Sequence, residues 1–282
     1  MGITSNWRPI VVFGAGVALA AVTLGQTAKP AQTAGSAVGN AALIDDLVVA
    51  NRILANENIL DGLGHVSARS VTNPNRFFES RDLAPGLVTS ADIVEYDVDG
   101  KPVDANAPAG VRERFIHAAI FKARPDVMAV VHSHMPSVLP FTDSTVALRP
   151  MYHMSSFLLT GAPVWDIRTV QGHVGMLVDD NTTGASLAQA LGNRTVVLLR
   201  GHGAAIVGST LPDAVSSAIF TDVNARAQAQ AIALGGGSIS YLTEADVAPG
   251  NPSPQPPSPP GTPGYYPRSW GIWKAKAMGS GR

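Results

Sequence analysis

The sequence predicts an α/β fold, on the evidence of three features. Residues 129–134 and 196–202 are two short apolar runs of the kind found in buried strands. Residues 113–121 and 211–233 have the apolar spacing of helices, and they flank these runs along the chain. Helices and strands that alternate in this way pack in layers, so we expect one sizeable domain with additional terminal segments.

Composition and charge exclude several classes of function. The chain of 282 residues has a formal net charge of −1, which gives no electrostatic basis for binding nucleic acid or an anionic membrane surface. It has no cysteine, so a thiol nucleophile, a thiolate metal site and a disulfide are all excluded. Any metal site must therefore use nitrogen and oxygen ligands.

Residues 1–37 are expected to form a signal peptide and a linker. Arg8 precedes the apolar run 10–24, which is short for a membrane span and is followed by small and polar residues. This layout predicts export to the periplasm and leaves a retained anchor as an alternative. Residues 10–20 also fit the strand and G-x-G-x-x-A turn of a dinucleotide-binding fold, but the acidic residue expected about 20 residues later is missing.

The main domain is expected to span residues 38–245. Amphipathic spacing predicts its first helix at 41–58. Segments of strand character follow at 65–69 and 77–79, then a strand end with a helical-type cap at Ser90 is expected at 87–92, and strand character returns at 93–103. Asp99 and Gly100 are typical of a two-residue turn, so the last of these segments is predicted to form a hairpin.

Histidines end both apolar runs, and this pattern predicts a metal site. His132 and His134 are two residues apart, so on an extended chain both imidazoles point to one face. His202 lies between two glycines, which allow close approach of the backbone, and Glu113 opens the preceding helix. Three imidazoles with an open position would form a Lewis-acid site, with Glu113 as fourth ligand or as acid and base. His117, one helical turn after Glu113, is expected to pack behind the site.

Residues 113–117, 123–134 and 198–203 resemble the class II aldolase and adducin family, and they follow one another along the chain in the order found in that family. The resemblance extends over residues 41–241. It implies a three-layer α/β/α fold with a central, largely antiparallel sheet. It also implies homotetramers whose pockets lie at subunit interfaces. By the same resemblance, the three histidines named above bind a divalent metal, with manganese, zinc and iron all open, and Glu113 is the acid and base.

Other residues distinguish this chain from the sugar-phosphate aldolases of the family. Those enzymes have asparagine where His65 stands, and small hydroxyl residues and glycine near Thr89 and just before the glutamate. Here Val111 and Arg112 precede Glu113. A guanidinium binds a planar carboxylate through two parallel hydrogen bonds, so Arg112 would suit a carboxylated substrate. A solvated arginine at the start of a helix is the alternative.

Residues 148–154 and 161–168 resemble the branch that contains the hydroxy-methylpyridine dicarboxylate and dihydroxyphthalate decarboxylases. In that branch Tyr152 and His153 match residues close to the substrate, so they are further candidates for the catalytic acid after Glu113. A buried aromatic ring and a hydrogen-bonded histidine are the alternative for this pair. The candidate substrate-binding residues are Arg112, Ser67, Arg69, Thr89 and Ser90.

The predicted function is that of a metal-dependent carbon–carbon lyase that decarboxylates a hydroxylated aromatic carboxylate through a metal-stabilised enolate. The missing phosphate-binding residues rank it above an aldolase that cleaves a hydroxy-carbonyl compound. A non-haem iron oxygenase is a further alternative. The complete metal set argues against a non-catalytic, adducin-like interaction module. The expected partners are a small carboxylate substrate and further copies of this chain, and no nucleic acid.

The C-terminal part is expected to lie outside the domain. Residues 246–264 are rich in proline, which predicts an extended linker. Residues 265–282 are predicted to contain a terminal helix that carries Trp270 and Trp273. The resemblance implies that this ending packs near the pocket or near a neighbouring subunit.

Overall fold

The structure is a computed structural model that describes residues 34–236, 238–247 and 267–279. The predicted signal peptide and linker lie outside these residues up to position 33, and residues 34–37 form the start of the first helix. The predicted proline-rich linker lies outside them from position 248 onward. Within the described ranges, no helix is long and apolar enough to cross a membrane.

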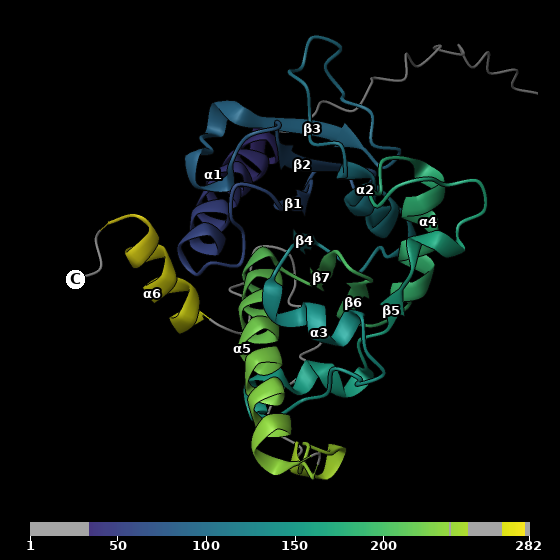
Figure 1. Cartoon of the computed structure of the whole chain (residues 1–282). Helices are drawn as coiled ribbons and strands as arrows, with labels where there is room; N and C mark the ends of the chain where they lie inside the picture. The colour runs from purple at the N-terminus through teal and green to yellow at the C-terminus, as the bar shows by residue number, and fades with distance from the viewer. Residues whose placement is uncertain (1–33, 237, 248–266, 280–282) are drawn as a thin grey trace, which may run out of the picture. The chain divides into compact units, whose positions relative to one another are not determined.

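Seven strands form one sheet in the order β3-β2-β1-β4-β7-β6-β5 (Figure 1). The strands are β1 (His65–Arg69), β2 (Arg76–Ser80), β3 (Ile93–Asp97), β4 (Ala129–Ser133), β5 (Val164–Trp165), β6 (Val196–Leu199) and β7 (Gly203–Gly208). Neighbouring strands pair antiparallel except β5 and β6, which pair parallel. The prediction of an α/β fold with a largely antiparallel sheet is confirmed.

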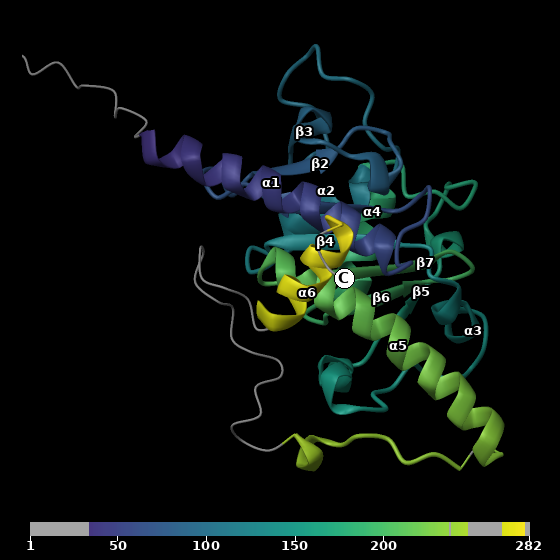
Figure 2. The ribbon, with the colours of Figure 1, turned by 90° about the vertical axis from the view of Figure 1, so that its left-hand side faces the viewer.

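Helices cover both faces of this sheet. They are α1 (Ala34–Asn56), α2 (Arg114–Ala123), α3 (Leu139–Thr142), α4 (Asn181–Leu191), α5 (Leu211–Gly235) and α6 (Pro267–Ala277). One core joins α1, α5 and Trp273 of α6 to the strands, and Figure 2 shows these three helices in front of the sheet. A second core joins α2 and α4 to the strands. The sheet therefore lies between two helical layers, and the three-layer arrangement is confirmed.

The strand β4 shows how the alternation of side chains places polar groups. Ala129 and Val131 belong to the core under α1 and α5, whereas Val130 belongs to the core under α2 and α4. The period of two places His132 on the same face as Val130, toward α2. Pairing of β1 with β4 sets the Cα of His65 opposite that of His132. Polar side chains at this end of the sheet therefore meet α2.

Two of the predicted strands are wrong in part. Residues 93–97 form β3, but the return arm of the predicted hairpin is reduced, within the described residues, to one bridge between Tyr96 and Pro102. Pro102 has no backbone N–H to donate to a strand ladder. The segment 87–92 forms no strand. It contributes instead to two short 3-10 helices, η1 (Pro85–Leu87) and η2 (Ser90–Asp92).

Candidate metal centre

Four polar side chains meet where β4 and the turn between β6 and β7 face the start of α2. The Nε2 atoms of His132 and His134 are 3.1 Å apart, and those of His134 and His202 are 3.0 Å apart. Glu113 Oε2 lies 3.5 Å from His132 Nε2, 3.4 Å from His202 Nε2 and 4.0 Å from His134 Nε2. The structure thus brings together the four residues of the metal set expected from the sequence.

Backbone geometry brings His202 to the end of β4. Gly201 in the turn has a φ of +61°, a left-handed conformation that favours glycine. Gly203 packs directly on β4, because a Cβ built there would lie 2.1 Å from the carbonyl oxygen of Ser133 and 3.0 Å from the Cα of His134. The glycines on either side of His202 therefore allow the close approach of the two segments.

Replacing Gly203 with alanine is expected to lower the free energy of unfolding by about 2 to 4 kcal/mol. The added methyl group would overlap backbone atoms that can move aside only by disturbing the pairing of β4 with β7. Chemical denaturation would measure the loss, and metal content should fall as His202 is displaced. Gly235→Ala is the matched control, since no atom lies within 4 Å of a Cβ built there. Equal stability of the two variants would contradict the close packing.

Backbone groups orient two of the four side chains. His132 Nδ1 lies 3.1 Å from the carbonyl oxygen of Ala204, which can only accept, so Nδ1 carries the proton and Nε2 keeps a free lone pair. Glu113 Oε1 accepts a hydrogen bond of 2.9 Å from the N–H of Val178, which leaves Oε2 facing the histidines. Imidazole lone pairs and a carboxylate at these separations fit a divalent first-row metal ion.

Burial and mutual contact keep these groups in the protonation states that a metal requires. Burial lowers the pKa of His132 to about 3, and Glu113 opposes this shift only in part. Burial, followed by the charge of His202, also lowers the pKa of His134. Burial raises the pKa of Glu113, but hydrogen bonds and charge from His132 and His202 outweigh it and lower the pKa overall. At neutral pH, His132 and His134 are therefore neutral and Glu113 is ionised.

Acidification of the metal-free protein from about pH 7 to about pH 5 is expected to lower its free energy of unfolding. Burial lowers the pKa values of His132, His134 and His117 in the folded chain, whereas an unfolded chain takes up these protons near the ordinary histidine pKa of about 6.5. The unfolded state therefore binds more protons in this window, and stability rises with pH by up to about 1.4 kcal/mol per pH unit for each histidine.

Urea denaturation in the presence of a chelator would measure this slope. Carboxylates are mostly ionised in both states above about pH 5, so they contribute little to it. Gln189→Ala is the control, because it removes an exposed side chain that carries no titratable group. A flat profile would show that the three imidazoles take up protons without unfolding.

Arg112 lies at the exposed edge of this cluster. Its side chain is 70% exposed, and its Nη2 lies 2.5 Å from Asp179 Oδ2. Asp179 directly follows Val178, which holds the carboxylate of Glu113. The guanidinium therefore reaches the segment that orients Glu113, and most of it is open to solvent.

Tyr152 and His153 lie apart from the cluster within one chain. Tyr152 immediately precedes the 3-10 helix η4 (His153–Thr160), and its ring packs edge to face on Phe220 at 6.1 Å. Burial raises the pKa of Tyr152 to about 12. His153 is exposed. In the described part of the chain, no hydrogen bond or ion pair joins either residue to the metal set, so their catalytic role stays a prediction.

The prediction that Arg69 binds substrate is wrong. It lies at the opposite end of β1 from His65 and is 4% exposed. Its guanidinium donates hydrogen bonds to the backbone carbonyls of Phe121, Arg124 and Val127. These buried acceptors occupy the donors of the guanidinium, so Arg69 ties the end of α2 to the sheet.

Ser67, Thr89 and Ser90 also have partners other than the metal set. Ser67 is buried, and its Oγ lies 2.5 Å from His117 Nδ1. Thr89 Oγ1 donates to Asp92 Oδ2 at 2.7 Å, and Ser90 Oγ donates to Asp45 Oδ1 of α1 at 3.1 Å. Thr89 and Ser90 are exposed, and their role in binding substrate stays a prediction.

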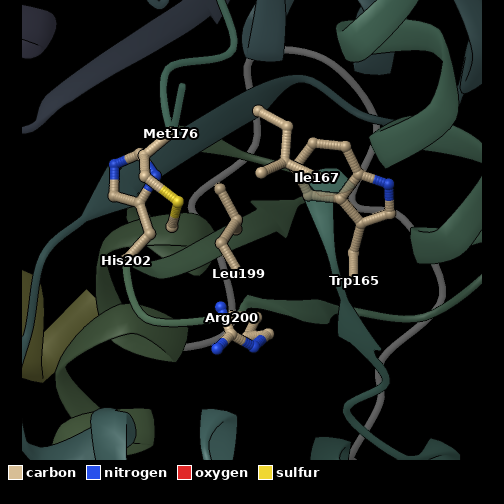
Figure 3. Close-up of a pocket in the computed structure, with 6 residues that line it drawn as sticks. All are labelled: Trp165, Ile167, Met176, Leu199, Arg200 and His202. Carbon is tan, nitrogen blue, oxygen red and sulfur yellow. The ribbon is translucent and has the colours of Figure 1, made fainter. Parts of the chain in front are cut away.

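A group of mostly apolar side chains packs beside His202 (Figure 3). The group consists of Trp165, Ile167, Met176, Leu199 and Arg200. Figure 3 shows Met176 next to the His202 ring, with Leu199 between this pair and Trp165. The sequence did not predict this flank of the site, because its members come from separate loops and strands.

A second buried polar group lies next to the centre. The expected packing of His117 behind the site is confirmed, but its contacts with His65 and Glu79 were not predicted. His65, Glu79 and His117 lie in mutual contact, and the ring of His65 is 5.2 Å from that of His132. The sequence indicates the burial of Glu79 only through the alternation of side chains along β2, which places it on the same face as the buried Phe77. Its partners could not be identified without the pairing of β1 and β2.

Comparisons with known proteins agree with this geometry. The family model for the Class II Aldolase and Adducin N-terminal domain matches residues 45–229. The decarboxylase tropJ of Talaromyces stipitatus is 42% identical over 195 residues, which cover 64% of this chain and 73% of that protein. The 3,4-dihydroxyphthalate decarboxylase of Arthrobacter keyseri is 31% identical over 239 residues, which cover 80% of this chain and 90% of that protein.

The fold has a solved counterpart as well. The crystal structure of an aldolase II superfamily protein from Pseudomonas syringae superposes with a TM-score of 0.69 and 22% identity, covering 85% of this chain and 93% of that one. At this identity the likeness supports the fold alone. Together, the match over residues 45–229 and the two decarboxylase relatives show that the chain belongs to the class II aldolase and adducin family.

Proposed function

We propose that this chain is a metal-dependent carbon–carbon lyase that decarboxylates a hydroxylated aromatic carboxylate. The observation that carries the proposal is the convergence of Glu113 Oε2 with three histidine Nε2 atoms. The two sequence relatives described above are decarboxylases, one of them named for 3,4-dihydroxyphthalate, and they confirm the prediction of a lyase of this family. Which ring system this chain accepts is part of the proposal.

The three histidines would hold the metal, with Glu113 beside it. When bound, a divalent metal supplies positive charge that stabilises the negative charge left on the substrate as the carbon–carbon bond breaks. The hydrogen bond from His132 Nδ1–H to Ala204 keeps that imidazole in the ligand tautomer. The N–H of Val178 fixes one carboxylate oxygen of Glu113 and leaves the other free for proton transfer.

Glu113 is suited to act first as a base and then as an acid. Because its pKa is lowered by His132 and His202 despite burial, it is ionised and can take the proton of the substrate hydroxyl on Oε2. Departure of CO₂ leaves an electron pair on the ring carbon, and Oε2 returns the proton to that carbon. The product then leaves as a phenolate and takes up one proton from water, which balances the reaction.

Arg112 would bind a carboxylate that stays on the ring. A guanidinium that gripped the departing group would oppose the loss of its charge as CO₂, so a second carboxylate is the better match. The substrate would displace Asp179 from Arg112, since the two carboxylates compete for one guanidinium. This favours an aromatic dicarboxylate over a monocarboxylate.

Arg112→Gln is expected to raise KM for a dicarboxylate about 10- to 100-fold with a smaller change in kcat, because one charged hydrogen-bonding partner is lost. Steady-state kinetics on a dicarboxylate and on the matching monocarboxylate would measure it. Arg226→Gln is the control, since it removes another exposed arginine–aspartate pair, on α5. The same KM change for both substrates would assign Arg112 a structural role.

Metal identity, assembly and location complete the proposal. Manganese, zinc and iron all suit the ligand set. We propose a homotetramer in which a neighbouring chain completes each pocket. Two observations support this: His153 is exposed, and within the described residues no hydrogen bond or ion pair joins it to the metal set. We also propose that the chain is exported to the periplasm, on the basis of the apolar run at 10–24.

The test is a substrate panel with the metal-loaded protein. The panel contains 3,4-dihydroxyphthalate, a related hydroxylated monocarboxylate and a sugar phosphate such as L-fuculose 1-phosphate. We expect CO₂ release from the aromatic acids and no aldehyde from the sugar phosphate. Aldehyde formation would favour the aldolase. Oxygen consumption with the iron form would favour the oxygenase, and the absence of turnover with every metal would favour the interaction module.

A further inference from the structure

A second cluster of ligand atoms lies between the sheet and α2. His65 Nδ1 is 2.8 Å from Glu79 Oε1 and 2.7 Å from His117 Nε2, and His117 Nε2 is 3.3 Å from Glu79 Oε1. The three residues are 5%, 0% and 0% exposed, respectively. They come from β1, β2 and α2, so the cluster joins three separate elements.

The carboxylate of Glu79 has no conventional partner in this setting. Within the described residues, the only nitrogen cations that could approach it within 4.0 Å are the two imidazoles. Neither of its oxygens accepts a hydrogen bond of normal geometry, although His65 Nδ1 is close. An ionised carboxylate that is fully buried without compensation is costly, so either a proton or a cation must neutralise Glu79.

Protons alone join the three atoms only through shared hydrogen bonds. If both imidazole nitrogens carried protons toward Glu79, two N–H groups would face each other at 2.7 Å. If only His65 Nδ1 carried a proton, Glu79 Oε1 and His117 Nε2 would share it, and the lone pair of His117 Nε2 would lie 3.3 Å from the carboxylate oxygen. One cation placed among the three atoms would satisfy every contact, because each atom would direct a lone pair at it.

The separations suit such an ion. Ligands at about 2.0 to 2.2 Å from a metal lie roughly 2.8 to 3.1 Å apart at octahedral angles and roughly 3.3 to 3.6 Å apart at tetrahedral angles. The three separations here are 2.7, 2.8 and 3.3 Å, which is nearer the octahedral spacing. Two imidazoles and one carboxylate form a common ligand set for divalent first-row metals. Ser67 Oγ lies 2.5 Å from His117 Nδ1 and holds that ring with its Nε2 toward the cluster.

We propose that His65, Glu79 and His117 form a second divalent-cation site, separate from the centre of Glu113 and the three other histidines. The two sites share no ligand residue, although His65 and His132 are partners across β1 and β4. An ion at the second site neutralises Glu79 and ties β1, β2 and α2 together beneath the first site. The proposal does not depend on the reaction proposed above.

Metal content per chain tests the proposal. The full chain and its variants would be loaded with zinc, passed through metal-free buffer and measured by elemental analysis. We expect about two ions in the wild type, about one in Glu79→Gln, about one in His132→Ala/His134→Ala and none in the combined variant. Glu95→Gln is the matched control, since it removes a carboxylate from the neighbouring strand β3, and it should keep both ions.

Stability provides a second readout. Glu79→Gln should be less stable than the wild type when both are loaded, and at least as stable when both are metal-free, because the substitution removes a buried charge. If Glu79→Gln does not fold, His65→Asn replaces it, since asparagine keeps a polar side chain but removes the imidazole ligand. Circular dichroism would establish that each variant is folded.

The outcomes separate this proposal from the proposed function. One ion in the wild type and none in His132→Ala/His134→Ala would overturn the second site and leave a hydrogen-bonded cluster. One ion in both proteins, lost in Glu79→Gln, would support the second site and remove the metal from the proposed reaction. Two ions that both persist in Glu79→Gln and in His65→Asn would also overturn the assignment.

Discussion

The double variant His132→Ala/His134→Ala is expected to lose turnover by at least about 1,000-fold, together with the metal of the catalytic centre. Two of the three imidazole ligands are removed, including His134, whose Nε2 lies 3.1 Å and 3.0 Å from those of His132 and His202. His202 and Glu113 alone provide too few ligands to retain an ion. The measurements are kcat/KM for CO₂ release and the metal content of the same preparation.

The control for this double variant is Gln189→Ala/Gln230→Ala, which also changes two residues but at exposed helical positions. It should keep full activity and metal. Circular dichroism would distinguish loss of the site from loss of the fold. If the double variant kept its activity without the metal, the reaction would not depend on the metal set, and the proposed function would be wrong.

Glu113→Gln is expected to lower kcat by about 100- to 10,000-fold while the three histidines still bind metal. The amide oxygen of glutamine can still accept the hydrogen bond from Val178, so the side chain keeps its place. The amide can neither take the hydroxyl proton nor return it to carbon. The measurement is kcat at saturating metal, with the metal content determined in parallel.

Glu95→Gln is the control here also, as an uninvolved carboxylate on β3. Recovery of full kcat at high metal concentration would assign Glu113 the role of a ligand only. A loss of kcat that persists with the metal bound would support its role in proton transfer. The result therefore separates the two roles that the sequence leaves open for this residue.

The metal set could be predicted because each ligand has a local signal. His132 and His134 are two residues apart at the end of an apolar strand, and His202 is flanked by glycines that permit the contact of the turn with β4. Glu113 precedes a helix of clear amphipathic spacing. Local pattern singled out the candidates, because strand ends fix the direction of their own side chains, and the family resemblance of the three stretches then joined them into one set.

Arg69 and Glu79 could not be assigned in the same way, because their partners are distant along the chain. Arg69 is held by carbonyls of residues more than 50 positions later. The partners of Glu79 depend on the register that sets Ser67 opposite it. No local pattern contains either contact, and polar residues in a strand are more often exposed than buried.

The placement of Tyr152 and His153 likewise depends on a remote helix. Asn224 of α5 donates a hydrogen bond of 2.8 Å to the carbonyl of Arg149 and accepts one of 2.7 Å from the N–H of Met151. These bonds fix the segment just before Tyr152. The buried side of α5 thus includes polar residues, which apolar periodicity alone does not indicate.

The groups that orient His132 and Glu113 are backbone atoms, and this has an evolutionary consequence. Glu113 is held by the N–H of residue 178 and His132 by the carbonyl of residue 204, so neither contact requires a particular side chain at these positions. Mutations can therefore accumulate around the ligands and reshape the surroundings for new compounds while the ligands keep their orientation. Descendants of one ancestral site could in this way acquire different substrates without first losing the ion.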